Sequence, residues 1–446
     1  MLQPISLLCI FMSVMMMFGT SSEGYQLLFL EPLFFGILYY YSKALRRFKF
    51  QYVALAILFV TSFIKYVITP FVLFSAGYPS TIITLGGDFL TQSILMQCYE
   101  EIFFFGIINY ASNHFYISDK SLPYQAFYVP PKNKILYIVI LIAIGLALYS
   151  PSLLSRFHFV WTLKGNEEFD INENEGLGGL GLLINVGRFF IILLLLLNLY
   201  KVRKNKQSIL LSLIVILINA TIVHDFSRFG IIIPATTFIY LLTLLYPDKK
   251  KKIIGFALIS IGASVVFTSI VKMFSEYRGG AERANEILYW AESLQLYFQG
   301  TNEVAIGLHA AEKHIIHPLL TLCNDAIANV ALLSKLSIQE LNSLYIFNTY
   351  RSGGISYDKI LPNICAGFNY FGVIGSPVII CVCSFFAIRF DALSLKMRNL
   401  HSKFIAVYAA ITLSLCHMIY YTMIISTLIN TILVMYILLK LNRKLN

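Results

Sequence analysis

The stretch that decides the fold of this chain reads GRFFIILLLLLNLYKVRKNK and covers residues 187–206. Its centre is a run of isoleucine and leucine, and its end is a basic cluster that begins at Lys201. A helix needs about 20 apolar residues to cross a hydrocarbon core of about 30 Å, and lysine and arginine collect beside its cytoplasmic end. The stretch therefore predicts a transmembrane helix and marks its cytoplasmic boundary.

The same pattern recurs along the whole chain. Of its 446 residues, 58% are hydrophobic and only 13% are charged, which excludes an ordinary soluble protein. The apolar runs are too long and too rich in leucine and isoleucine for barrel strands. We therefore expect an all-α polytopic membrane protein with about 12 transmembrane helices. The predicted spans are residues 2–20, 25–42, 52–75, 89–111, 135–150, 177–200, 207–224, 230–247, 253–273, 364–388, 404–421 and 423–440. The last two have no polar break between them, so a hairpin near Tyr420 is inferred from length alone.

Basic residues predict the orientation of these spans. Clusters follow every second span, at Lys43–Lys49, Lys120–Lys134, Lys201–Lys206, Lys249–Lys252, Arg389–Lys403 and Lys440–Lys444. Because lysine and arginine are enriched in cytoplasmic loops, both termini are expected in the cytoplasm. The net charge of +11 is then a signal of topology and requires no nucleic-acid partner.

The longest polar segment, residues 273–363, is predicted to face outward. It separates residues 1–272, with helices 1–9, from residues 364–446, with helices 10–12. Loops longer than about 15 residues are uncommon and are usually functional.

The periodicity of this outward segment predicts helices. One covers 281–298 with Ile287, Trp290, Leu294 and Tyr297 on its apolar face, and another covers 302–322 with a kink near Pro318. Ser337 and Glu340 have the spacing of a capping box that would open a third helix toward Phe347.

Several function classes have no support in the sequence. There is no Walker motif, no nucleotide-binding fold and no soluble cytoplasmic domain, since the largest inward loop covers only residues 112–134. The seven cysteines show no CxxC or Cys/His pattern, so neither a disulfide framework nor a metal site is indicated. We expect no cofactor.

Each end of the outward segment carries an arginine followed by paired glycines. The first is Tyr277-Arg278-Gly279-Gly280, and the second is Tyr350-Arg351-Ser352-Gly353-Gly354. Arginine binds phosphate oxygens through a planar fork, and glycine lets backbone N–H groups approach an anion. The pair is interpreted as two halves of one anion-binding site. The alternative is that the arginines anchor the loop at lipid head groups while the glycines end helices.

Further polar residues stand out because charge is costly near apolar spans. Arg228 lies in the polar turn His224–Gly230 between spans seven and eight, and Arg188 lies well inside span six. Arg156 belongs to an outward segment that is either a solvated loop or a sugar-binding lid.

Lys65 and one of the adjacent Glu100 and Glu101 could form a structural ion pair, with a proton relay as the alternative. Glu303 and His309 in the long segment are candidate general bases.

The arrangement resembles the Wzy-type polymerases of O-antigen and capsular polysaccharide. The resemblance rests on about 12 spans with one long outward loop late in the chain. It also rests on three short elements, Ser227-Arg228-Phe229-Gly230, Tyr297-Phe298-Gln299-Gly300 and Asn369-Tyr370-Phe371-Gly372-Val373-Ile374-Gly375. The arginine-x10-glycine elements of some members are absent, because Tyr289 and Pro362 occupy the corresponding positions.

The resemblance implies a metal-independent glycosyltransferase in the bacterial cytoplasmic membrane. It would join repeat units linked to a polyprenyl (undecaprenyl) pyrophosphate, with a chain-length regulator and a flippase as further partners. The leaving pyrophosphate would be held by Arg228, Arg278 and Arg351. The acceptor hydroxyl would be activated by Glu303 or His309. The residues that would contact substrate are Tyr277, Gly279, Gly280, Tyr350, Gly353, Arg156 and Arg188. A lipid-oligosaccharide flippase and an O-antigen ligase are the alternatives.

Overall fold

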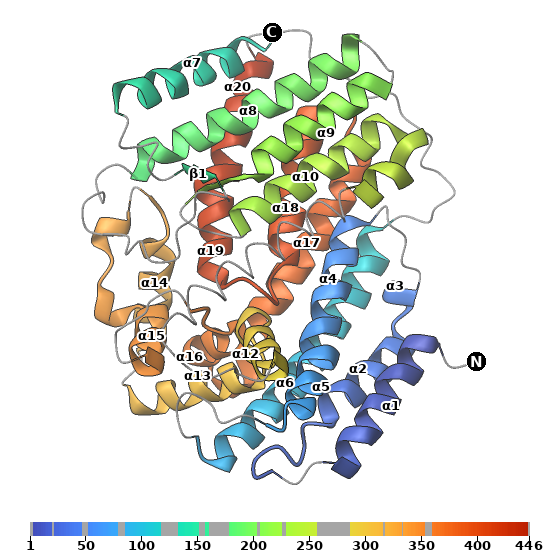
Figure 1. Cartoon of the computed structure of the whole chain (residues 1–446). Coiled ribbons are helices and arrows are strands. Elements are labelled where there is room, and N and C mark those ends of the chain that lie inside the picture. The colour runs from blue at the N-terminus through green and yellow to red at the C-terminus, as the bar shows by residue number, and fades with distance from the viewer. Residues whose placement is uncertain are drawn as a thin grey trace. The chain divides into compact units, whose positions relative to one another are not determined.

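The computed structural model describes most of the chain. The described residues are 3–19, 22–46, 52–78, 85–116, 133–150, 157–159, 178–202, 206–224, 229–256, 286–314, 317–331, 333–352 and 359–444. Within these ranges the structure is helical apart from one two-stranded ribbon (Figure 1).

Apolar helices of membrane-spanning character confirm a helical membrane protein. Four are long and apolar enough to cross a bilayer: Val53–Ser75, Leu180–Lys201, Val378–Lys396 and Tyr421–Lys444. Five shorter ones are Pro4–Gly19, Lys134–Tyr149, Gln207–Ala220, Ile232–Leu245 and Leu400–Ser414. The predicted ninth span, residues 253–273, lies mainly outside the described residues.

The chain forms two compact units that interleave in sequence. Unit 1 consists of Met1–Leu122, Arg283–Leu393 and Ala409–Leu428, and unit 2 consists of Pro123–Glu282, Ser394–Tyr408 and Ile429–Asn446. The helices of the long predicted loop from Arg283 onward therefore belong to the same unit as the N-terminal helices.

Unit 1 begins with apolar helices that pack around an aliphatic core. They are α1 (Pro4–Gly19), α2 (Leu30–Tyr41), α3 (Lys43–Arg46), α4 (Val53–Phe63), α5 (Thr69–Ser75) and α6 (Gly87–Phe115). Leu28, Leu73 and Ile94 from this part are fully buried together with Ala305 from the long segment. Because Ala305 belongs to this core, the long segment is anchored in the bundle by burial of apolar surface.

A wide turn interrupts the helix that runs from α4 to α5. Residues Ile64–Ile68 form a π-helical segment, η1, directly before Thr69-Pro70. Proline has no N–H group to donate to the carbonyl four residues earlier, so a local widening of the helix before Pro70 is expected. This segment carries the buried side chains of Lys65 and Tyr66.

The described part of the long segment forms four helices in unit 1. These are α12 (Glu286–Tyr297), α13 (Thr301–Lys313), α14 (Pro318–Ala328) and α15 (Ser343–Ser352), with the 3₁₀ turns η8 (Ser334–Leu336) and η9 (Gln339–Leu341) between the last two. The predicted break near Pro318 is confirmed, since Pro318 begins α14.

One detail of the predicted helices is wrong. Ser337 does not cap a helix: its hydroxyl donates to the Ser334 carbonyl, and α15 begins later, where the Tyr345 amide donates to the Asn342 side chain. Local spacing identified the helix but could not choose between competing caps.

Helix α12 buries Ala291 and Gln295 against protein, while Ile287 and Trp290 of the predicted apolar face are exposed. An exposed apolar face with tryptophan is typical of a helix that lies at a membrane interface.

The predicted tenth span, residues 364–388, is two helices instead of one. These are α16 (Asn363–Gly375) and α17 (Val378–Lys396). Gly372 adopts φ +69°, a left-handed conformation that glycine tolerates, and Pro377 follows the end of α16. Hydropathy alone did not reveal this break, because both helices are apolar.

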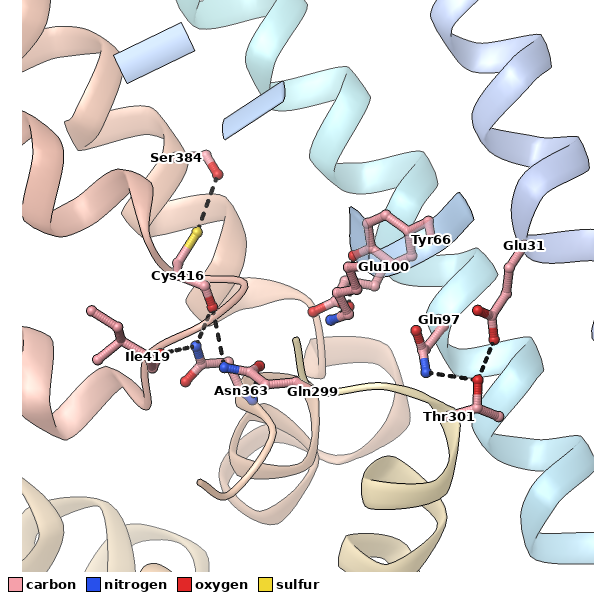
Figure 2. A network of polar contacts seen from close by, with 11 residues as sticks. Glu31, Tyr66, Gln97, Glu100, Gln299, Thr301, Asn363, Ser384, Cys416 and Ile419 are labelled. Carbon is pink, nitrogen blue, oxygen red and sulfur yellow. Dashed lines mark hydrogen bonds and ion pairs between the residues drawn. The ribbon is translucent and has the colours of Figure 1, made fainter. Parts of the chain in front are cut away.

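The C-terminal helices contain the predicted break before Tyr421. Helix α18 (Leu400–Ser414) ends in a turn, after which α19 (Tyr421–Ser426), the π-helical η10 (Thr427–Leu433) and α20 (Val434–Lys444) follow. The buried Asn363 side chain holds this turn: its amide donates to the carbonyls of Cys416 at 2.6 Å and Ile419 at 2.8 Å (Figure 2). Its side-chain oxygen accepts from the Tyr421 N–H at 2.8 Å.

Replacement of Asn363 by alanine is expected to destabilise the protein by about 2–3 kcal/mol. The change removes the partner of the Ile419 carbonyl and of the Tyr421 N–H and leaves the Cys416 carbonyl only the weaker bond from Gln299 at 3.5 Å. Each buried group without a partner costs about 1–3 kcal/mol before the structure relaxes. The measurement is thermal and denaturant unfolding of the purified protein in detergent, followed by circular dichroism. The matched control is Asn113→Ala at an exposed position, which should change stability by less than about 0.5 kcal/mol. Equal stability of the two variants would contradict the role of Asn363.

Unit 2 contains apolar helices that follow one another in sequence and pack in order. They are α7 (Lys134–Tyr149), α8 (Gly178–Val202), α9 (Lys206–Ala220) and α10 (Phe229–Leu245), with the 3₁₀ turn η6 (Pro247–Lys249). The strands β1 (Phe157–Phe159) and β2 (Ile222–His224) pair antiparallel, with Phe157 opposite His224. The predicted outward segment after α7 and the predicted turn between α9 and α10 are thus joined by a ribbon.

Candidate functional site

Four of the residues singled out in the sequence come together on two neighbouring helices of unit 1. Glu303 and His309 lie on α13, and Tyr350 and Arg351 lie at the end of α15. Helices α13 and α15 lie against each other (Figure 1). Because the two helices are far apart in sequence, this arrangement depends on how α13 is held.

Hydrogen bonds to other segments of unit 1 hold the first turn of α13 in place. The Thr301 hydroxyl donates to Glu31 of α2 at 2.9 Å, and the Asn302 side-chain oxygen accepts from the Tyr25 hydroxyl at 2.8 Å. The preceding Gly300 permits close packing, since a Cβ there would lie 2.3 Å from the side-chain oxygen of Gln295. That oxygen accepts the Asn302 N–H at 2.9 Å. The tight turn Gln299-Gly300 therefore sets the start of α13 and the position of Glu303.

Glu303 and Arg351 form a two-pronged ion pair. Arg351 donates from Nε to Oε2 at 2.9 Å and from Nη2 to Oε1 at 2.8 Å. The arginine side chain is 10% exposed and the glutamate 5% exposed. A bidentate pair of this kind fixes both the position and the plane of the guanidinium. Glu303 also lies in the first turn of α13, where the helix dipole favours a negative charge.

His309 and Tyr350 form the second pair of the site. The Tyr350 hydroxyl lies 2.7 Å from Nδ1 of His309. The imidazole also packs against the ring of Phe89 of α6, with ring centroids 4.5 Å apart and an angle of 31° between the planes. Burial raises the pKa of Tyr350, so this phenol stays neutral at physiological pH. The two contacts fix the orientation of the imidazole and leave Nε2 as the nitrogen remote from Tyr350.

A second buried polar cluster connects the long segment to α16 and α19. The Asp325 carboxylate of α14 accepts hydrogen bonds from the hydroxyls of Ser343 and Tyr370, and the hydroxyls of Tyr370 and Tyr421 lie 2.6 Å apart. Burial raises the pKa of Asp325, while the surrounding hydroxyl donors act in the opposite direction. The donors satisfy the carboxylate, so we interpret the cluster as the joint that fixes α14 and the start of α15.

Arg188 lies in unit 2, beneath the β1–β2 ribbon. Its Nη1 donates to the Ile222 carbonyl at 3.1 Å, and the guanidinium lies over the rings of Phe157 at 5.6 Å and Phe189 at 5.2 Å. In the described structure Arg188 thus supports the ribbon through packing and a backbone hydrogen bond.

The other predicted site residues lie outside the described residues. They are Arg156, Arg228, Tyr277, Arg278, Gly279, Gly280 and Gly353. The interpretation of the two Arg-Gly-Gly ends as one anion-binding site stays a prediction, with Arg351 as the described member.

Sequence reasoning identified residues of the site but missed their partners. Glu303 and Arg351 were both expected to act, yet their pairing had no local signal, and Phe89 carried no signal for a contact with histidine. The predicted ion pair of Lys65 is confirmed: its Nζ lies 2.6 Å from Oε2 of Glu100. Among the described residues, no group of three or more histidine, cysteine, aspartate or glutamate side chains could hold a metal ion.

In chemical terms the site offers a fixed cation, a carboxylate and a nitrogen base on one side of unit 1. A guanidinium can bind phosphate oxygens, and an oriented imidazole can accept a proton. No protein-family model, no curated protein and no solved structure matches this chain.

Proposed function

We propose that this protein polymerises oligosaccharide repeat units linked to a polyprenyl pyrophosphate, on the outer face of a bacterial cytoplasmic membrane. In this proposal about 12 helices span the membrane, both termini are cytoplasmic, and the segment 273–363 faces outward. The observation that carries it is the adjacency of the Glu303–Arg351 and His309–Tyr350 pairs on α13 and α15. Together these pairs supply a phosphate-binding cation beside a candidate base.

Arg351 is the proposed ligand of the leaving pyrophosphate. The reaction breaks the bond between the donor sugar C1 and its phosphate oxygen, so negative charge develops on the pyrophosphate. In the structure Glu303 occupies Nε and Nη2 of Arg351. A bound pyrophosphate would compete with Glu303 for this guanidinium, which gives Glu303 the role of holding the arginine in place. The carboxylate is less suited to the role of base, since both of its oxygens accept from Arg351.

His309 is therefore the favoured base of the two candidates. In the tautomer that carries its proton on Nδ1, the imidazole donates to the Tyr350 oxygen and keeps a lone pair on Nε2. Nε2 would take the proton of the acceptor hydroxyl while the acceptor oxygen bonds to the donor C1. The products are a lengthened lipid-linked chain, a lipid pyrophosphate and a protonated histidine that returns its proton to solvent.

The surface of unit 1 beside this site is suited to a lipid-linked substrate. Trp290 and Ile287 of α12 are 54% and 46% exposed. Tryptophan is enriched at membrane–water interfaces, where its ring lies among lipid head groups. The lipid part of the substrate is proposed to enter along this helix.

Arg228 and Arg278 are the other proposed ligands of the pyrophosphate, and Arg156 is a proposed substrate contact. In sequence, Arg156 directly precedes β1 and Arg228 follows β2, the two strands of the ribbon in unit 2. The roles of these three arginines rest on the sequence, because they lie outside the described residues.

The test is polymer chain length in producing cells that carry Arg351→Ala. Loss of one fixed charge at the leaving group is expected to lower the rate by about 10²- to 10³-fold, so surface chains should fall to a single repeat. Arg351→Lys keeps the charge but loses the planar fork, and it should give chains of intermediate length. Lys335→Ala, at an exposed position of the same segment, is the control for protein level and normal length.

The same experiment separates the alternatives. Normal ladders from Arg351→Ala, together with Arg228→Ala and Arg278→Ala, would contradict the proposed site. Lipid-linked units retained on the cytoplasmic face would indicate a flippase. Full-length polymer that accumulates on its lipid carrier would indicate an O-antigen ligase.

A further inference from the structure

Three glutamates and one lysine lie buried together in the apolar helices of unit 1. They are Glu31 on α2, Lys65 on η1, and Glu100 and Glu101 on α6, and each is 0% exposed. Only Lys65 and Glu100 were expected to pair. Glu31 joins the group through tertiary packing, since α2 packs against both α6 and η1.

Two chains of hydrogen bonds run through this group (Figure 2). In the first, Oε2 of Glu100 accepts from Lys65 Nζ at 2.6 Å and from the Tyr66 hydroxyl at 2.8 Å. In the second, the Thr301 hydroxyl donates to Glu31 at 2.9 Å and accepts from the Gln97 amide at 3.4 Å. Gln97 lies one helical turn before Glu100 and Glu101 on α6, so the two chains share this helix.

Several acceptor atoms in the group are buried without a hydrogen-bond partner. They are both carboxyl oxygens of Glu101, Oε2 of Glu31, Oε1 of Glu100 and the side-chain oxygen of Gln97. His417, whose ring lies edge-on to that of Tyr66 with centroids 5.6 Å apart, is fully buried with both ring nitrogens unpartnered. The carboxyl and amide oxygens in this set only accept, so each lacks a hydrogen-bond donor. The neutral His417 ring has one donor and one acceptor nitrogen.

The charges of the group do not balance if all three carboxyls are ionised. Three carboxylates against one ammonium leave a net charge of −2 (−3 + 1) at fully buried positions. The effective cost of a buried unpaired ion is several kcal/mol, so such groups take up a proton instead. Lys65 neutralises Glu100, with which it is paired. Glu31 and Glu101 have no cation of their own in the described structure.

The other titratable groups around the cluster do not change this balance. They are Tyr66 from η1, Cys9 from α1, Cys98 from α6, Cys365 from α16, and Cys416 and His417 from the turn before α19. Thiols and phenols are neutral when protonated and add no positive charge. A positive charge on His417 would itself require the uptake of a proton.

We propose that Glu31 and Glu101 form a buried proton-binding site within the helices of unit 1. The site holds two protons at neutral pH, one for each carboxyl that has no cation. It exists independently of any activity of the outward segment. Its position nonetheless links it to that segment, because the Glu31 partner Thr301 begins the helix that carries Glu303 and His309.

Infrared spectroscopy of the purified full-length protein in lipid vesicles tests this proposal. Protonated carboxylic acids give a carbonyl stretching band that is separate from the bands of carboxylates. We expect this band at pH 7 in the wild-type protein and its gradual loss at alkaline pH. Glu31→Gln and Glu101→Gln should each remove the intensity of one carboxyl, and the double variant should remove both.

The matched control is Glu312→Gln, which alters an exposed carboxyl of α13 and should leave the band at pH 7 unchanged. Asp325→Asn separates any contribution of the Asp325 cluster. Should either glutamine variant unfold, Glu31→Asp and Glu101→Asp retain the carboxyl and should shift the band without removing it. The proposal is overturned if Glu31→Gln and Glu101→Gln both retain the wild-type band. It is also overturned if the addition of sodium ions at constant pH removes the band of the protonated carboxyls, since the site would then bind a metal cation.

Discussion

Replacement of Lys65 by methionine is expected to lower the free energy of unfolding by about 3–5 kcal/mol, the usual cost of removing one partner of a buried ion pair. Methionine fills most of the volume of the lysine stem, so the loss comes from charge and not from a cavity. In the variant the Glu100 carboxyl stays fully buried and keeps only the Tyr66 hydroxyl as its described donor. Thermal and denaturant unfolding in detergent measure the effect.

The double variant Lys65→Met/Glu100→Gln provides the comparison. With both charges removed, no uncompensated ion remains, and most of the lost stability should return. Lys313→Met, at an exposed position of α13, should change stability by less than about 0.5 kcal/mol. If Lys65→Met were as stable as the wild type, or if the double variant were as unstable as Lys65→Met, the ion pair would not have the role assigned to it.

Replacement of His309 by alanine is expected to reduce polymerisation by about 10²- to 10⁴-fold, the usual contribution of a positioned general base. The variant loses the nitrogen that would take the proton of the acceptor hydroxyl, while the Glu303–Arg351 pair remains intact. The measurement is elongation of lipid-linked repeat units by the purified protein in vesicles. Tyr350→Phe should lose less, because it removes only the hydroxyl that orients the imidazole.

Two controls separate a base from a structural residue. His317→Ala changes an exposed histidine of the same segment and should retain activity. Added imidazole should partly restore His309→Ala, since it can occupy the space left by the ring and accept the proton. Full activity of His309→Ala would show that another group is the base. A loss that imidazole cannot restore, accompanied by a lower unfolding temperature, would indicate that the ring acts through its packing against Phe89.

The helices of this protein were largely predictable because their signals are local. A membrane helix is visible in the sequence as about 20 consecutive apolar residues. A proline that begins a helix marks the start of the helix by its own position in the sequence. The position of α8 and the start of α14 follow from such signals. The break before Tyr421 followed only from the length of the apolar run. The division of residues 364–388 into α16 and α17 did not follow, because the residues on both sides are equally apolar.

The candidate site was predictable only as a set of residue types. Arg351, Glu303 and His309 stand out because charged and titratable side chains are rare in this chain and are costly near a membrane. Their pairing depends on the packing of α13 against α15, which has no trace in sequence spacing. Glu31 illustrates the same limit: it is one acidic residue in an apolar span until α2 and α6 bring it near Lys65 and Glu101.

The composition and spacing of the residues identify a helical membrane protein, the positions of most of its helices, and the few polar residues that require an explanation. These are properties of single segments, since burial in lipid acts on each helix through its own composition. Which polar groups meet depends on the packing of the helices. In the part of the chain that the structure describes, Glu303 pairs with Arg351 and His309 with Tyr350, while Glu31 and Glu101 have no cation of their own. The physical reason is that in a low-dielectric interior a charge is governed by the neighbours within a few ångströms, and those neighbours come from helices distant in sequence.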